Sequence, residues 1–340
     1  MPKHAAIEIL RTDLLEHPAV KAWSALQPER VEPEGIGILK ERSLRKSAVY
    51  RLAGVGPTSA AVIAKRCRQA DAVIERTIYE QVLPHLPITA LHYYGFVEER
   101  DGEYCWIFLE DAGREEYSPF IEEHRTLAAQ WLGLMHTSAT CVTATAHLPD
   151  RGPGHYLEHL RSGRARIRRN LANPALDADD LVILETIVSQ YDGLVLRWGQ
   201  VEEFCEGLPR TLIHGDFTGK NVRVRTGQAG IVLLPFDWED AGWGVPAADL
   251  AQSPPLLTGF SANPDVATYW SVVRDHWPSL DLLTIQRLVN CGKMFRCLAA
   301  INWNARGLAY EQVEWAMSDM RIYQAALVDA LQAAGWERIH

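Results

Sequence analysis

One short segment of the sequence places an acidic residue close to an amide. In the stretch IHGDFTGKN at 213–221, Asp216 stands five positions before Asn221, and an apolar run at 231–236 later ends at Asp237. These residue types suit phosphoryl transfer. A carboxylate must orient or accept the proton of the attacking hydroxyl, while oxygen ligands hold Mg2+ against the β- and γ-phosphates. Asp216 fits the first role, and Asn221 and Asp237 fit the second.

A hairpin would bring the two expected metal ligands together. Apolar residues follow Asn221 directly, and the turn RTGQAG at 225–230 is suited to joining two short strands. Residues 222–236 are therefore predicted to form a strand pair that returns Asp237 beside Asn221.

The rest of the chain divides into a β-rich first third and a mainly helical remainder. Alternating and continuous apolar patterns predict strands at 35–39, 47–52, 60–64, 91–98 and 104–110. Residues 72–86 have helical spacing, and residues 1–30 are expected to be irregular or helical. We expect an α+β fold with a lobe boundary near residue 110, giving an N-terminal lobe at 1–110 and a C-terminal lobe at 111–340.

Size and composition restrict the class of protein. A chain of 340 residues exceeds the usual size of a single core, and its net charge of -9 argues against non-specific nucleic-acid binding. The six cysteines form no CxxC pair, so reduced thiols are expected. No apolar run approaches the roughly 20 residues of a membrane span, and the N-terminus does not have the pattern of a signal peptide. We expect a cytoplasmic protein with no membrane partner. The sequence does not indicate the oligomeric state.

Several motifs resemble one family, the aminoglycoside phosphotransferases and choline kinases, which are relatives of the protein kinases. Its catalytic loop H-G-D-x-x-x-x-N is matched by His214, Gly215, Asp216 and Asn221. FDWE at 236–239 is similar to its Ile-Asp-Trp-Glu segment, and PAADLA at 246–251 is similar to its Pro-x-x-Asp-Leu-Ala segment. The resemblance spans roughly residues 36–325. It implies that His214 and Asp249 support the catalytic loop.

The resemblance also implies a nucleotide site. The expected fold is bilobal and protein-kinase-like, with a small five-stranded antiparallel sheet and a helical second lobe. Lys65 would contact the phosphates of ATP or GTP and pair with Glu75, with Glu80 as the second choice. The phosphate-covering loop would be residues 42–47, including Ser47. The adenine would lie against the connector at 109–112, which includes Glu110 and Ala112. Mg2+ is the implied cofactor.

The molecule that accepts the phosphoryl group is less well defined than the nucleotide that donates it. The family implies a hydroxyl of a small molecule such as an amino sugar, an aminoglycoside or an amino alcohol. The candidate acceptor residues are Asp240, Trp243, Trp270 and Glu314, since aromatic and acidic groups suit a cation. Tryptophan also fills cores. An arginine-rich helix, from 156 to about 171, is interpreted as a solvated face, with a site for an anionic ligand as the alternative.

Two other functions remain open. A catalytically silent nucleotide-binding pseudokinase is disfavoured because the expected reacting residues are present. A protein kinase is disfavoured because the chain has no Ala-Pro-Glu motif and little sequence separates Asp237 from the segment at 246–251.

The sequence departs from many relatives at Lys220, where they have glycine or proline.

Overall fold

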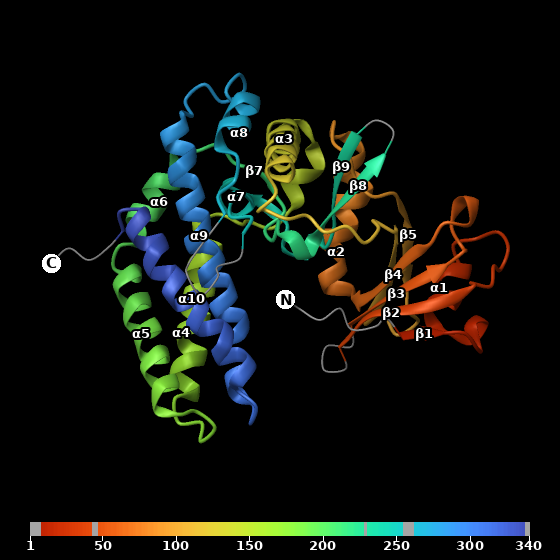
Figure 1. Ribbon diagram of the computed structural model, residues 1–340, viewed down its shortest axis with the longest axis horizontal. Helices are drawn as coiled ribbons and strands as arrows, with labels where there is room; N and C mark the ends of the chain where they lie inside the picture. Colours follow the sequence, from red (N-terminus) through yellow and green to blue (C-terminus); the bar gives the residue numbers. More distant parts are fainter. Residues whose placement is uncertain (1–7, 43–46, 228–229, 254–261, 337–340) are drawn as a thin grey trace. The chain divides into compact units, whose positions relative to one another are not determined.

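The computed structural model describes residues 8–42, 47–227, 230–253 and 262–336 (Figure 1). The chain forms two compact units. The first unit combines Met1–His85, Thr89–Glu115 and Arg223–Glu239, and the second combines Leu86–Ile88, Glu116–Val222 and Asp240–His340.

The first unit contains an antiparallel sheet of six strands in the order β1-β2-β3-β4-β6-β5. The strands are β1 (Glu8–Leu10), β2 (Gly35–Arg42), β3 (Ser47–Ala53), β4 (Val62–Arg68), β5 (Tyr93–Glu98) and β6 (Tyr104–Glu110). Five strands were predicted, and β1 is the additional one. It has only three residues and is defined by its pairing with β2, so the local sequence carries too little alternation to indicate it. Residues 43–46 of the expected phosphate-covering loop lie outside the described residues.

Alternation along the strands creates the core of this unit. Every second residue of β3 is buried, as expected for a strand with one face on a core, whereas six of the seven residues of β6 are buried. Trp23 of α1 (Pro18–Ser24) packs on Phe108 at a ring-centroid distance of 5.3 Å. The helix α2 (Gln69–Thr77) contacts β4 and β6 and continues into a π-helical turn, Ile78–Val82.

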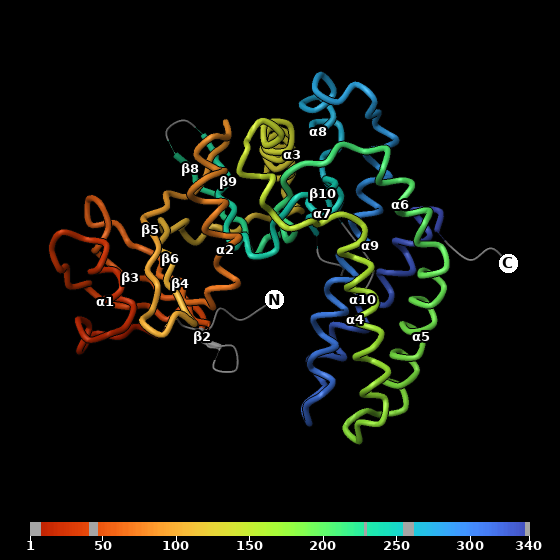
Figure 2. Tube along the Cα trace, turned by 180° about the vertical axis from the view of Figure 1, so that it is seen from behind, coloured from red at the N-terminus to blue at the C-terminus, as the bar shows by residue number. Residues whose placement is uncertain are grey.

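The second unit is built from helices around α9, whose 23 residues, Leu282–Asn304, are mostly buried. This helix contacts α4, α7, α8 and α10, and α4 runs beside it in Figures 1 and 2. The helices of this unit are α3 (Glu122–Ser138), α4 (Pro153–Asn170), α5 (Ala178–Val195), α6 (Trp198–Glu206), α7 (Ala247–Leu250), α8 (Val266–Val273), α9 and α10 (Glu314–Ala333).

Two small strand pairs complete the fold. The strands β7 (Thr211–Ile213) and β10 (Gly242–Gly244) pair in the second unit. The predicted hairpin is present as β8 (Val222–Gly227) and β9 (Gly230–Pro235). One unit built on an antiparallel sheet and one built mainly of helices confirm the predicted α+β class. None of the helices in the described ranges is long and apolar enough to cross a membrane.

Candidate active site

The loop after β7 carries Asp216, and its backbone conformation requires glycine at position 215. Gly215 has φ of +81°, and a Cβ atom there would lie 2.5 Å from the carbonyl oxygen of Asp240. A side chain at this position would therefore meet both backbone strain and a backbone clash. The sequence HGD thus has a steric reason for its central residue.

The carboxylate of Asp249, on α7, binds the backbone of this loop. One carboxylate oxygen accepts a hydrogen bond from the backbone N–H of His214 and the other from that of Gly215, both at 2.8 Å. Asp249 is fully buried, and its Oδ2 also lies 3.2 Å from Nε2 of His136. Nδ1 of that histidine is 2.8 Å from the hydroxyl of Tyr269. A continuous chain of buried polar contacts therefore fixes the loop.

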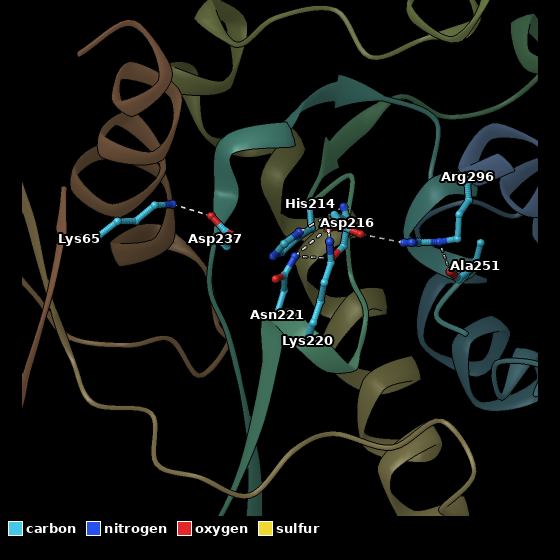
Figure 3. Close-up of polar contacts among 8 residues, drawn as sticks. All are labelled: Lys65, His214, Asp216, Lys220, Asn221, Asp237, Ala251 and Arg296. Atoms are coloured by element: carbon cyan, nitrogen blue, oxygen red, sulfur yellow. Dashed lines mark hydrogen bonds and ion pairs between the residues drawn. The ribbon is translucent and has the colours of Figure 1, made fainter. Parts of the chain in front are cut away.

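Asp216 is buried among cationic and amide donors in the second unit (Figure 3). Its Oδ1 accepts from Arg296 at 3.1 Å, and its Oδ2 accepts from Lys220 at 2.6 Å and from Asn221 at 2.9 Å. Burial by itself raises the pKa of this carboxyl, but Arg296 and Lys220 outweigh it and hold the pKa below its ordinary value. The Asp216 carboxylate is therefore ionised at neutral pH and acts as a hydrogen-bond acceptor.

Asn221 is the last residue of the 3-10 turn Gly219–Asn221, and the nitrogen of its side-chain amide points toward Asp216. That nitrogen donates to the Asp216 carbonyl at 3.1 Å as well as to its carboxylate. The amide oxygen is then the group that remains for another ligand. Such a hard oxygen donor suits Mg2+.

The first unit holds a second cluster around Lys65 of β4. Its Nζ lies 2.6 Å from Oε2 of Glu75. It also lies 2.5 Å from Oδ1 of Asp237, a contact drawn in Figure 3. Burial lowers the pKa of Lys65, but the two carboxylates outweigh it and raise the pKa well above its usual value. Burial raises the pKa of Glu75, and Lys65 opposes this effect.

Asp237 has a strained backbone. Its φ of +66° is in the left-handed region, which is uncommon for residues other than glycine and is often found at functional sites. Its carboxylate gives this unit an oxygen donor of the kind that Mg2+ prefers. Glu80, the second choice as partner of Lys65, is engaged elsewhere, with Arg76 at 3.0 Å and the hydroxyl of Tyr93 at 2.7 Å.

The remaining residues expected at the nucleotide site lie at or just after strand ends of the first unit. Ser47 begins β3, and Ala112 is buried just after β6. Glu110, the last residue of β6, accepts from Arg225 at 2.6 Å and from the backbone N–H of His92 at 3.1 Å. The side chain of Glu110 is therefore anchored by Arg225 and by the backbone of His92.

The four residues expected at the acceptor all lie in the second unit, in different environments. Asp240 follows Glu239 in a 3-10 turn, and its carbonyl accepts from Arg151 at 3.1 Å. Trp243 is half-buried in β10, whereas Glu314 is exposed at the start of α10. The indole of Trp270 donates to Leu280 at 3.0 Å, and its ring lies under Arg274.

Arg296 was missed by the sequence analysis. It lies in the middle of α9, 80 positions after Asp216, with no motif around it. One signal was present, because an arginine inside the otherwise apolar run at 294–301 must find an acceptor if the helix is buried. Arg296 satisfies this need by donating to the carbonyl of Ala251 at 3.0 Å and to Asp216.

Comparison with known proteins gives a family match. Residues 46–282 match the model of the phosphotransferase enzyme family. A search of curated protein sequences found no significant match.

Three solved structures illustrate the likeness in fold. A mutant aminoglycoside 2'-phosphotransferase in complex with GDP has a TM-score of 0.60 at 15% identity, covering 92% of this chain and 98% of its own. A spectinomycin phosphotransferase with ADP and spectinomycin has a TM-score of 0.57 at 10% identity. The match covers 90% of this chain and 95% of that one. The choline kinase of Cryptosporidium parvum has a TM-score of 0.56 at 14% identity. The match covers 88% of this chain and 91% of the choline kinase. These similarities show a kinase-like fold and confirm the resemblance found in the sequence.

Proposed function

The chain belongs to the phosphotransferase enzyme family, and on that premise we propose that it transfers the γ-phosphoryl group of ATP or GTP to a hydroxyl of a small molecule. The observation that carries this proposal is the buried, ionised Asp216 on a loop braced by Asp249. A carboxylate held in this way can orient the acceptor hydroxyl and receive its proton as the bond to phosphorus forms.

The donor nucleotide and Mg2+ are assigned to residues of both clusters. In this proposal the amide oxygen of Asn221 and the carboxylate of Asp237 hold Mg2+, which neutralises charge on the phosphates when bound. Lys65 contacts the α- and β-phosphates and is kept charged and oriented by Glu75. The structures similar to this chain include complexes with ADP and with GDP, so both donors are included.

For the acceptor, amine-bearing alcohols are the first class to test. This choice is supported by the names of the similar structures, which include a choline kinase and a spectinomycin phosphotransferase. Amino sugars, aminoglycosides and amino alcohols are the corresponding compounds.

The test is Mg2+-dependent release of ADP or GDP with this panel and with neutral sugars, using Asp216→Asn as the active-site variant. Turnover should fall by about 10²- to 10⁴-fold in that variant, because the group that receives the proton is lost. Nucleotide-induced thermal stabilisation should persist. Asp275→Asn, at a side chain that is 86% exposed, is the matched control and should keep full activity.

Two results would contradict the proposal. Asp216→Asn turning over at the wild-type rate would remove Asp216 from the mechanism. Nucleotide binding without turnover of any acceptor would favour the pseudokinase alternative, and labelling of proteins but not small molecules would favour a protein kinase.

A further inference from the structure

Two histidines of the second unit face each other on α4. His155 and His159 are one helical turn apart, and their Nε2 atoms are separated by 3.1 Å. Both rings are half-buried. At this distance one nitrogen must donate and the other accept, unless something else lies within reach of both.

The protonation of His155 is determined by its other ring nitrogen. Nδ1 lies 3.2 Å from a guanidinium nitrogen of Arg151. A guanidinium has only donors, so this nitrogen must accept the hydrogen bond. A neutral His155 therefore carries its hydrogen on Nε2, the atom that faces His159.

The protonation of His159 follows from a second chain of contacts. Its Nδ1 lies 2.9 Å from Nδ2 of Asn302 on α9. The orientation of that amide is determined by Arg166, which donates to its Oδ1. The amide nitrogen must then donate to His159, which places the histidine's hydrogen on Nε2 as well. The two Nε2 atoms are thus both donors.

Protonation does not relieve this conflict. Burial lowers the pKa of His155 to about 3 and that of His159 to about 4. Nearby arginines add to both effects, and the acids that oppose them are Asp150 for His155 and Glu158 for His159. Both rings are therefore neutral near pH 7. A further proton would in any case only add another donor.

The surrounding charge favours an anion over a metal ion. The cations that act on His159 come from three segments and are Arg151, Arg166 and Arg306. Binding a metal through both Nε2 atoms would move the hydrogens to Nδ1, where they would face the N–H groups of Arg151 and Asn302. An oxygen acceptor between the Nε2 atoms has no such cost.

Contacts within the second unit connect this pair to Asp216. Nε of Arg151 donates to the Asp240 carbonyl, the same oxygen that lies against Gly215. By a second route, Tyr156 stacks on Phe295 at a centroid distance of 3.8 Å, and the next residue of α9, Arg296, pairs with Asp216. Two short chains of contacts therefore link the histidines to the loop expected to receive the acceptor hydroxyl.

We propose that His155 and His159 bind an anionic oxygen group of the acceptor, a carboxylate or a phosphate monoester, while the acceptor's hydroxyl reaches Asp216. This inference rests on the proposed function and narrows its substrate class to hydroxyl compounds that carry an oxyanion. An amine on the same molecule is compatible with it, whereas a purely cationic or neutral alcohol would leave the two donors without their acceptor.

Matched acceptor pairs test this inference. Each pair differs by an oxyanion: ethanolamine and serine, aminopropanol and homoserine, glycerol and glycerate, glucosamine and glucosamine 6-phosphate. The anionic member should have the higher kcat/KM. In His159→Phe, which keeps an aromatic ring but removes the donor, KM for that member should rise about tenfold or more, with KM for the nucleotide unchanged.

The conservative variant separates binding from folding. Gln has an amide N–H near the position of Nε2, so His159→Gln should retain most of the affinity, whereas His155→Phe should behave like His159→Phe. Thermal unfolding of all three variants shows whether the helix is intact. A water molecule bridging the two donors would instead predict the same KM in every variant, and that result would overturn the proposal.

Direct binding distinguishes failure of this inference from failure of the proposed function. Calorimetric titration with the anionic compounds and with inorganic phosphate should show binding to wild type and loss in the His155→Phe/His159→Phe variant, even if no compound is turned over. The inference is overturned if the neutral or cationic members are the better substrates, or if the double variant binds the anions as wild type does.

Discussion

Arg296 donates to Oδ1 of Asp216 at 3.1 Å although the two residues are 80 positions apart. The side chains of both are less than a tenth exposed, so little water screens the pair. This contact joins the central helix of the second unit to the loop that carries Asp216. It also helps to hold the pKa of the buried Asp216 carboxyl below its ordinary value.

Replacing Arg296 with Met should raise the pKa of Asp216. In wild type the pKa is held below its ordinary value, so the stabilisation that the carboxylate provides is present at neutral pH and is lost as pH falls through that low pKa. Without Arg296, burial is opposed mainly by Lys220. In Arg296→Met, the acidic limb of the kcat/KM profile should move upward by about one pH unit. The pH below which the protein loses stability in acid should rise by about the same amount.

The matched control is Arg287→Met, at an exposed position on the same helix, where the guanidinium lies over Phe204 at 4.7 Å. It should leave the pH profile unchanged. An Arg296→Met profile that coincides with wild type would show that this pair does not set the ionisation of Asp216.

Lys65 should be as important for stability as for nucleotide binding. Glu75 is 1% exposed, so Lys65→Met leaves a buried carboxylate without its partner, at a cost of about 3 kcal/mol in the free energy of unfolding. Glu75→Gln should restore part of this loss in the double variant, because the fully buried residue at position 75 then carries no charge. Urea denaturation of the two single variants and the double variant measures this coupling; equal losses in Lys65→Met and the double variant would contradict it.

The placement of Asp216 and Asn221 in one loop between two strands could be predicted because its information is local. Asp216 and Asn221 stand five positions apart in one loop, and the strands that flank them have clear apolar patterns. The family and the α+β fold were predicted from the same signals. The pairing of Lys65 with Glu75, only ten positions away, was expected from the family resemblance, and Nζ of Lys65 lies 2.6 Å from the Glu75 carboxylate.

Features that depend on distant parts of the chain were missed. The three residues of β1 become a strand only through their pairing with β2. Arg296 and Asn302 acquire their roles from contacts made with other segments. The histidines of α4 were overlooked because its arginines dominate the local pattern. Two of these, Arg164 and Arg168, pair with Asp192, while Arg166 binds Asn302, so the helix is only partly a solvated face.

Asp249→Asn should weaken the loop that carries Asp216. An amide has a single oxygen, so it cannot accept from both His214 and Gly215, and its nitrogen would face a backbone N–H. We expect a loss of about 2 kcal/mol or more in unfolding free energy, together with a fall in kcat. Thermal denaturation and steady-state kinetics measure the two effects.

The graded comparison for this variant is Tyr269→Phe. It removes only the hydroxyl that contacts His136, two contacts further from the loop than Asp249, so the fall in kcat should be smaller than in Asp249→Asn. The reverse order would show that Asp249 does not act through the loop.

Gly292 allows α9 to approach α7 closely. A Cβ atom at this position would lie 1.8 Å from the carbonyl oxygen of Ala247. Gly292→Ala should therefore push apart the helices that carry Arg296 and Asp249, lowering stability by about 2 kcal/mol and reducing kcat.

The control is Gly199→Ala in α6, where an added Cβ would have no neighbour within 4 Å. Because alanine favours the helix, that variant should gain about 0.5–1 kcal/mol and keep its activity. Urea denaturation gives both values. If Gly292→Ala is also stabilised, helix propensity rather than the approach of α9 to α7 dominates at this position, and the contact between the two helices is not what holds Arg296 at Asp216.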